Sequence, residues 1–448
     1  MKKNVYDIAI LGSGLSSLTA ILKILETNPK LKICVISSNK NSSKECLSES
    51  SINYLKKNHT KIAKNISKKQ VDNLLLKSSK RYKTSFIQTF NFGGFGSFWG
   101  GGLFPIHRKS KNFKEIYEFI LKNFNVININ KKNNKKKLTI RNNLFEIIEY
   151  DPKFIFNNFH KAGTKYIIDP GKEIRSLSEK FKFRVYGNTF LENFIFNKDN
   201  YIFTLSSSKN KKIYAKNIII GLGVLNSPLF LKNSKFIDNE NIEISEHKLY
   251  RIPFINLKAL FNNYFFKQTD NNFFEKYRKF ISLKESFLLK VIRRYLFIGI
   301  YFFPNQFFMR IPILNKLCNK KIIGFSQIYL GNEYRTSTLI ISLSKNKFKQ
   351  KIISKPRLNL FEIFNIIIFL FSKSLIPLPF KYSLKFGSSY HFYGSLKNKN
   401  IDFDKINITN NIEVIDSSTI SSIGAEPSSF LLIKNSYLRT KKILKNFE

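Results

Sequence analysis

The sequence predicts an α/β protein with two sheets, one mostly parallel and one mostly antiparallel. The first observation is a short, mostly apolar run at residues 7–11 that enters a glycine-rich turn and then a helix-like repeat of apolar residues. The second is a series of short runs between Leu249 and Ser344 that alternate apolar and polar residues, which is typical of antiparallel strands. A chain of 448 residues is long enough to form two domains around these sheets.

A glycine-rich turn follows the first predicted strand. Gly12 allows the chain to turn tightly, and Gly14 lets a pyrophosphate approach the main chain. Ser17 stands at the third small position of the pattern, where it keeps the helix close to the strand. The amides at the start of the helix face an anion with their partial positive charge. The sequence therefore predicts a Rossmann-like dinucleotide site at these residues.

The second predicted strand, residues 31–38, follows at the spacing of a βαβ unit. An acidic residue that would hold the adenosine ribose is absent from its end, and Ser37 or Ser38 stands there instead. We take Ser37 as the candidate contact. A secretory signal is the alternative for this region, because residues 1–3 carry basic side chains and a mostly apolar stretch follows. Asp7 and the second strand argue against a signal.

A second glycine-rich segment occupies residues 91–105, where six glycines occur within ten residues. Such density indicates a backbone that bends tightly or meets a ligand closely. A flexible linker is the alternative, but linkers do not interleave aromatic residues and the only Trp of the chain. We therefore predict a loop that contacts a cofactor through Gly94, Gly96, Ser97, Trp99 and Gly100.

The middle of the chain predicts a hairpin that leads into a helix. Residues 193–205 and 212–221 are strand-like, and the polar residues 206–211 form the turn between them. The second strand ends in another glycine turn. Ser227 and Pro228 then predict the start of a helix, with Ser as its cap and Pro at its first position.

The net charge of the chain is +46, which is extreme. A nucleic acid or an anionic membrane would suit such a charge. The basic residues do not gather in one stripe, however, and Lys, Asn, Ile and Phe are raised together, as a genome-wide compositional bias would produce. We therefore predict no nucleic-acid partner.

The cysteines and histidines show no metal-binding spacing, so we predict no metal site. The cysteines indicate a reducing compartment and hence a cytoplasmic protein. Cys34 lies in the second predicted strand and is expected in the core. The remaining cysteines and the histidines are Cys46, Cys318, His59, His107, His160, His247 and His391.

Two segments are unusually apolar, residues 295–308 and 364–380. Neither is a convincing membrane span, because Pro304 interrupts the first, and Asn365 and Lys373 interrupt the second. Aromatic segments bordered by Arg and Lys are suited to docking at a membrane interface, and ordinary core helices are the alternative. The predicted location is thus cytoplasmic, with a possible peripheral place at the inner face of the membrane.

Five segments of the chain carry motifs, at residues 12–17, 93–99, 221–231, 389–395 and 414–428. In their residues and in their order these motifs resemble the glucose-methanol-choline (GMC) family of FAD-dependent oxidoreductases. Residues 232–387 match no motif, and this is where the family keeps its variable substrate domain.

The resemblance implies FAD as the cofactor and hydride transfer from an alcohol carbon to flavin N5. It also implies that His391 is the base that removes the hydroxyl proton. Glu426 stands where most members carry Asn or His, so it binds the substrate, acts as the base, or marks altered or lost catalysis. Asp416 is expected to contact the polar chain of FAD. Ser428 is expected to open the last helix, whose amides face the C2 carbonyl side of the flavin.

We therefore predict a Rossmann-like FAD-binding domain at residues 1–110, 165–235 and 385–448, and a substrate-binding domain at residues 111–164 and 236–384. The predicted activity is oxidation of a CH–OH group in a sugar, a glycan precursor or a lipid-linked alcohol. The alternatives are a catalytically degenerate flavoprotein that binds a membrane surface, and a nicotinamide dehydrogenase, which would explain only the first glycine loop. The motifs do not indicate the electron acceptor.

Overall fold

The structure of the chain is a computed structural model. It describes residues 4–38, 92–94, 102–103, 112–124, 126–128, 139–142, 145–150, 154–156, 170–197, 199, 202–207, 211–237, 241–262, 278–285, 295–301, 313, 317, 320, 322–331, 336–344, 347–353, 357–358, 360–372, 374–379, 381–384, 386, 391–396, 411–423 and 428–448.

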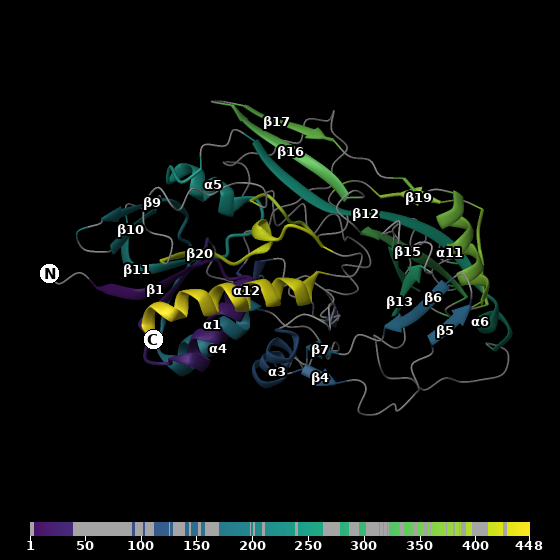
Figure 1. Cartoon of the computed structure of the whole chain (residues 1–448), viewed down its shortest axis with the longest axis horizontal. Coiled ribbons are helices and arrows are strands. Elements are labelled where there is room, and N and C mark those ends of the chain that lie inside the picture. The colour runs from purple at the N-terminus through teal and green to yellow at the C-terminus, as the bar shows by residue number, and fades with distance from the viewer. Residues whose placement is uncertain are drawn as a thin grey trace.

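The first sheet has seven strands, and its centre is parallel (Figure 1). β1 pairs in parallel with β2 and β11, β2 pairs with β8, and β11 pairs with β20. β10 and β9 continue the sheet beyond β11 as an antiparallel meander. Its strands are β1 (Val5–Leu11), β2 (Ile33–Ile36), β8 (Arg184–Tyr186), β9 (Leu191–Asn197), β10 (Ile202–Ser207), β11 (Lys212–Ile220) and β20 (Ile412–Val414).

Helices cover both faces of this sheet, because β1 alternates its apolar side chains between two cores. Ile8 and Ile10 face the core that includes α1, α3, α4 and α12, whereas Ala9 and Leu11 face the core that includes α5. Every one of these four side chains is fully buried. The helices are α1 (Leu15–Thr27), α3 (Phe113–Asn123), α4 (Pro170–Phe181), α5 (Asn226–Asn233) and α12 (Ser429–Leu444).

The second sheet has ten strands, and all of its pairings are antiparallel. Its path is β17-β16-β12-β15-β14-β13-β6-β5, and β18 and β19 also pair with β12. Helix α11 (Leu360–Ser372) covers one face. The strands are β5 (Thr139–Asn142), β6 (Phe145–Tyr150), β12 (Asn241–Asn256), β13 (Arg278–Glu285), β14 (Tyr295–Tyr301), β15 (Ile323–Gly331), β16 (Thr336–Ser344), β17 (Lys347–Ile352), β18 (Leu375–Pro377) and β19 (Tyr382–Ser383).

The long strand β12 of the second sheet runs from near the centre of the molecule toward α11 (Figure 1). Residues 241–247 of this strand pair with β16, and residues 248–255 pair with β15. A backbone bridge also joins Ser245 to Tyr393, which lies two residues beyond His391. The smaller elements are a three-stranded sheet, β3 (Gly102–Leu103), β4 (Val126–Asn128) and β7 (Phe154–Phe156), the helix α6 (Leu257–Asn262), and the 3₁₀ turns η4 (Ser417–Thr419) and η5 (Lys445–Phe447).

The structure confirms the predicted fold class and corrects three local predictions. Residues 193–205 form two strands instead of one, because the Asn197 side chain accepts a hydrogen bond from the Asp199 amide and turns the chain. The helix α5 begins at Asn226, so Ser227 lies inside it and does not cap it. Residues 295–301 form the strand β14, which excludes the core-helix interpretation for that segment.

Several predictions lie outside the described residues. They concern the polar connection at residues 39–83, together with Cys46, His59, His107, His160 and Cys318. The predicted division into domains stays a prediction. No helix in the part of the chain that the structure describes combines the length and apolar character needed to cross a membrane.

Candidate active site

Gly12 makes the turn at the end of β1 possible. Its φ is +102°, and a Cβ atom at this position would lie 2.3 Å from the carbonyl oxygen of Gly221. Any side chain here would therefore meet the backbone that follows β11, in a conformation that only glycine adopts readily. The contact partner is protein, so Gly12 serves the packing of the chain itself.

Gly14 differs because the space above it is open. Among the described residues, a Cβ atom there would have only the Gly93 carbonyl oxygen within reach, at 4.0 Å, and one on Gly94 would lie 3.5 Å from the Gly14 Cα atom. The two glycine segments thus meet at the N-terminus of α1, where unpaired amides favour an anion. Gly223 also has φ above zero, +90°, and no atom of the residues that the structure describes lies within 4 Å of its Cβ position. These residues fit a bound dinucleotide phosphate.

Serine hydroxyls connect the two glycine segments to β2. The Ser13 hydroxyl accepts a hydrogen bond from the Gly93 amide at 3.1 Å and pairs with the Ser37 hydroxyl at 3.0 Å. Ser37, predicted to contact a ribose, is buried and points toward the first loop. Ser17 is fully buried, and its hydroxyl oxygen lies 2.6 Å from the position that a Cβ atom on Gly221 would take. Only small residues therefore fit at these two positions, where α1 meets the end of β11. The predicted spacing role of Ser17 agrees with this geometry, while cofactor contact by either serine stays a prediction.

Asp416 holds three parts of the chain together. One carboxylate oxygen accepts hydrogen bonds from the Gly223 amide, at 2.8 Å, and from the Ser227 hydroxyl. The other accepts from the Ser418 amide at 2.9 Å and caps η4. The Ser227 hydroxyl, expected to cap a helix, thus binds Asp416 instead. This hydrogen bond fixes the glycine turn after β11 against the C-terminal segment. Contact of Asp416 with the cofactor, which the family resemblance implies, stays a prediction.

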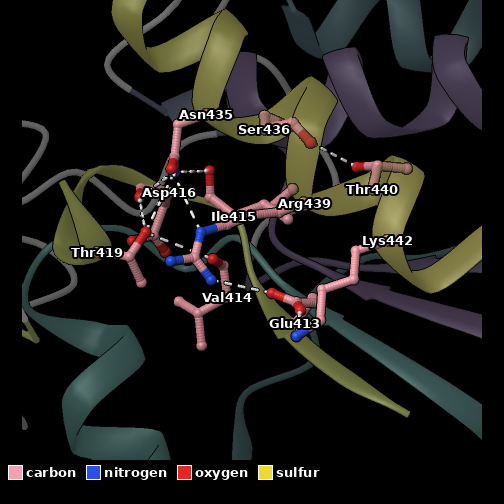
Figure 2. A network of polar contacts seen from close by, with 10 residues as sticks. All are labelled: Glu413, Val414, Ile415, Asp416, Thr419, Asn435, Ser436, Arg439, Thr440 and Lys442. Atoms are coloured by element: carbon pink, nitrogen blue, oxygen red, sulfur yellow. Dashed lines mark hydrogen bonds and ion pairs between the residues drawn. The ribbon is translucent and has the colours of Figure 1, made fainter. Parts of the chain in front are cut away.

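A polar network anchors the segment of Asp416 to the last helix (Figure 2). The Asn435 amide donates to the carbonyl oxygens of Ile415 and Asp416, both at 3.1 Å. Glu413 is buried, and its carboxylate pairs with Arg439 at 2.9 Å and with Lys442 at 2.6 Å. A buried carboxylate is tolerated only when it is paired in this way. The network therefore places Asp416 at a fixed position relative to α12.

The segment of His391 lies as a strip between the two sheets. On one side, Tyr393 exchanges both backbone hydrogen bonds with Ser245 of β12, each at 2.9 Å. On the other side, the Gly394 amide donates to the Ser417 carbonyl at 3.0 Å, and the Ser395 hydroxyl donates to the carbonyl of Val224. The position of His391 is therefore set by β12 of the second sheet and by the segments that follow β11 and β20 of the first sheet.

Aromatic side chains surround His391. Its ring centroid lies 5.2 Å from that of His247, which meets it edge-on, and 6.0 Å from that of Tyr329, which stacks on it with an interplanar angle of 20°. Its Nδ1 atom is buried. Burial lowers the pKa of His391 to about 4, because the charged imidazolium loses hydration. The imidazole is therefore neutral at physiological pH and able to accept a proton.

His247 and Tyr329 are the residues that the sequence did not single out. His247 is fully buried in β12, and its Nδ1 atom lies 3.3 Å from the carbonyl oxygen of Leu330. That geometry suits a neutral tautomer with the proton on Nδ1. The available signal was the unusual position of a histidine within a long buried strand. The prediction had classed it with the scattered histidines.

The remaining predicted site residues divide into two groups. Ser428 opens α12 by its position, although its side chain makes no capping hydrogen bond, and its carbonyl accepts from the Leu432 amide at 2.9 Å. The second group lies outside the described residues and comprises Gly96, Ser97, Trp99, Gly100 and Glu426.

The comparisons with known proteins agree with this geometry at the level of the fold. No family model and no curated protein matches the sequence. The structure is similar to pyridoxine 4-oxidase from Mesorbium loti, with a TM-score of 0.56 and 9% sequence identity over 98% of this chain and 99% of that chain. It is also similar to a formate oxidase variant from Aspergillus oryzae RIB40, with a TM-score of 0.52 and 10% identity over 100% of this chain and 99% of that chain. The chain has the GMC oxidoreductase fold.

The GMC fold explains why the motifs lie so far apart in the sequence. Gly14 and Gly94 meet at the first loop, and Asp416 reaches the turn after β11, so segments from both ends of the chain build one region. The sequence motifs had indicated this fold through their order, and the structure confirms it. The individual roles of the site residues remain predictions.

Proposed function

We propose that this protein is a FAD-dependent oxidoreductase that oxidises the CH–OH group of a sugar, a glycan precursor or a lipid-linked alcohol. When bound, FAD supplies the hydride acceptor at N5 of its flavin ring. Gly14, Gly94 and Gly223 would hold its phosphates and polar chain, because their Cβ positions are open or border another glycine. The observation that carries the proposal is the position of the His391 imidazole, between the rings of His247 and Tyr329, in a chain with the GMC fold.

In this proposal His391 takes the hydroxyl proton of the substrate. The Nδ1 atom is buried, so we assign the role of accepting the substrate's hydroxyl proton to the Nε2 atom. The imidazole is in its neutral form at physiological pH, which is the form that accepts a proton, and the rings of His247 and Tyr329 keep it oriented. The two oxidases with similar folds act, by their names, on pyridoxine and formate, so a substrate panel should include both.

The test is the rate at which substrate reduces the flavin in the absence of oxygen. His391→Ala should retain FAD and reduce it on the order of 100-fold more slowly, because a general base is lost. Added imidazole should restore part of the rate by occupying the space of the ring. An unchanged rate in His391→Ala would remove His391 from the reaction.

Glu426 is the second catalytic candidate of the proposal. Most GMC members carry Asn or His at this position, and a fixed negative charge would disfavour a negatively charged reduced flavin. We propose that Glu426 is protonated, paired with a cation or turned toward the substrate. Glu426→Asn should then keep FAD and shift the pH dependence of turnover. Superimposable pH profiles would place Glu426 outside the reaction, and no flavin reduction in either form would favour the degenerate flavoprotein.

We also propose that the protein docks on an anionic membrane surface through α11. Four apolar side chains form a stripe on its outer face, with 86% of Leu360, 60% of Phe364, 39% of Ile368 and 54% of Phe371 exposed. Leu260 and Phe261 of α6 are exposed as well, and the Leu257 amide donates to the Ser374 carbonyl just beyond α11 at 3.0 Å. A contiguous apolar surface of this kind is typical of an interaction site.

Charge favours a membrane over an apolar protein partner. Lys258 and Arg357 are exposed in α6 and just before α11, and the whole chain carries a net charge of +46. We expect binding to vesicles that contain anionic lipid, weaker binding at high salt, and little binding by a Phe364→Ser, Phe371→Ser variant. Ile195→Ser is the control, since Ile195 is 65% exposed on the distant strand β9. Equal binding to neutral and anionic vesicles would contradict the proposal.

A further inference from the structure

The sheet around β12 and β15 has two faces of different chemistry. One face is apolar and packs against α11 through Tyr250, Ile252 and Ile328. The opposite face carries the polar side chains of Arg251, Gln327 and Tyr329 beside the apolar Leu249 and Phe325. The pairings of Arg251 with Gln327 and of Leu249 with Tyr329 align these side chains across the two strands. His247 lies on this same face by the strand alternation. A buried polar face is costly unless it has a binding role or a complete set of partners.

Three side chains on the polar face form a chain of hydrogen bonds. The Arg251 Nε–H donates to the Gln327 side-chain oxygen at 2.9 Å, and the Gln327 amide nitrogen donates to the Tyr329 hydroxyl at 2.6 Å. The Arg251 guanidinium also lies over the Phe325 ring, 4.5 Å from its centroid. Stacking and the Nε–H bond fix the plane of the guanidinium. Gln327 and Tyr329 are both buried.

This chain begins at the predicted base. The Tyr329 ring stacks on His391, and its hydroxyl leads through Gln327 to Arg251. Residues two apart on a strand are separated by about 7 Å, so Arg251 lies one such interval along the sheet from Tyr329. Gly299 of β14 is paired with Gln327 and brings no side chain to the sheet there. Small molecules of a few carbon atoms span this interval.

The charge of Arg251 has no carboxylate partner among the side chains that the structure describes. Its Nε–H is occupied by Gln327, and the two terminal nitrogens are the ones that bind a carboxylate or phosphate in a forked geometry. The guanidinium is partly exposed and held in one plane, which prepares it for such a ligand.

We infer that this polar face is the substrate-recognition wall, and that the substrate is an alcohol which also carries an anionic group. Arg251 binds the carboxylate or phosphate, and Gln327 and Tyr329 position it relative to His391. The inference rests on the proposed oxidation at His391 and adds the class of substrate. Arg251 and Gln327 are specificity residues here, because they act at the far end of the substrate and not at the reacting carbon.

Binding is the readout that separates this inference from the proposed activity. Calorimetry on the purified full chain compares glycerol phosphate with glycerol, lactate with propanediol, and pyridoxine phosphate with pyridoxine. In the pair that the protein binds best, we expect the anionic compound to bind at least about 10-fold more tightly than the neutral one. Inorganic phosphate alone should bind weakly and compete. Binding of the anion without flavin reduction would sink the oxidation and leave the recognition wall in place.

The variants test Arg251 directly. Arg251→Gln should weaken binding of the anionic compound about 10- to 100-fold and leave binding of the neutral compound unchanged. Arg251→Lys should fall between, since it keeps the charge but loses the fork. Lys381→Gln is the matched control, because it removes an exposed positive charge next to Tyr382, which pairs with Arg251.

Gln327→Leu guards against a folding defect at Arg251. This substitution removes the hydrogen bond that orients the Arg251 guanidinium but keeps its charge. The affinity for the anionic compound should therefore fall less than in Arg251→Gln. Equal affinity for the anionic and neutral compounds in the wild-type protein would overturn the inference. An equal loss in Arg251→Gln and Lys381→Gln would also overturn it, because general electrostatic attraction would then account for the binding.

Discussion

The first glycine loop and the surroundings of His391 are built in opposite ways. The loop is built from backbone atoms. Gly12, Gly14 and Gly94 have no side chains, and this lets main-chain atoms approach one another closely. The His391 site uses side chains: an imidazole, a second imidazole and a phenol ring come from the strip of His391, from β12 and from β15. Distant segments meet in both sites, but the backbone site requires that no side chain stands at the contact points, whereas the side-chain site requires three particular side chains.

The largest expected effect separates two glycines of the same loop. Gly12→Ala should lower the free energy of unfolding by at least about 3 kcal/mol, because its φ is +102° and the new Cβ would clash with Gly221. Gly14→Val should change stability little but abolish flavin binding, because its side chain would enter the open space beside Gly93. Urea unfolding of the apoprotein and the flavin content of the purified variants measure the two effects.

Retention of flavin by Gly14→Val would show that the phosphates lie elsewhere. Gly14→Ala is the graded control, since in the described part of the chain its Cβ would meet one atom, 4.0 Å away. If Gly12→Ala proved as stable as the wild type, the loop would be more adaptable than its backbone geometry indicates.

The two regions also differ in how far the sequence could predict them. β1, α1 and β2 were predictable because the signal is local: an apolar strand, two glycines and a helical repeat occur in order. The positions of Gly94 and Asp416 followed from the family resemblance, and the structure brings Gly94 beside Gly14. Periodicity also indicated the antiparallel sheet correctly.

The errors arose where a distant partner decides the outcome. Ser227 has the sequence of a helix cap, but Asp416, 189 residues away, binds its hydroxyl. His247 looked like any scattered histidine, because only the pairing of β12 with β15 and the bridge to Tyr393 bring it to His391. Residues 295–301 were too apolar to distinguish a strand from a helix by composition. Local patterns do not contain these contacts.

A second, intermediate effect is expected at the junction of the two regions. Asp416→Asn keeps the shape of the side chain but removes the charge that accepts hydrogen bonds from Gly223, Ser227 and Ser418. We expect a loss of about 2 to 3 kcal/mol in the free energy of unfolding, because hydrogen bonds to a buried charge are weakened together. Ser227→Ala removes one donor and should cost about 1 kcal/mol. A loss in Asp416→Asn no greater than in Ser227→Ala would contradict the role of Asp416 as a three-way anchor.

The smallest expected effect tests whether the side-chain site is truly enclosed. The pKa of His391 falls from 6.5 to about 4 on folding, so between these values the unfolded chain binds a proton that the folded protein excludes. Above pH 6.5 the imidazole is neutral in both states, so its titration does not affect the free energy of unfolding. As the pH falls from 6.5 toward 4, protonation of the unfolded chain lowers that free energy progressively. Between pH 7 and pH 5 the wild type should lose about 1 to 2 kcal/mol more than His391→Gln, whose side chain does not titrate. Urea unfolding of both proteins at the two pH values gives this difference directly. A constant difference across that range would mean that water reaches His391 freely, and a base so exposed would titrate near 6.5 in the activity profile as well.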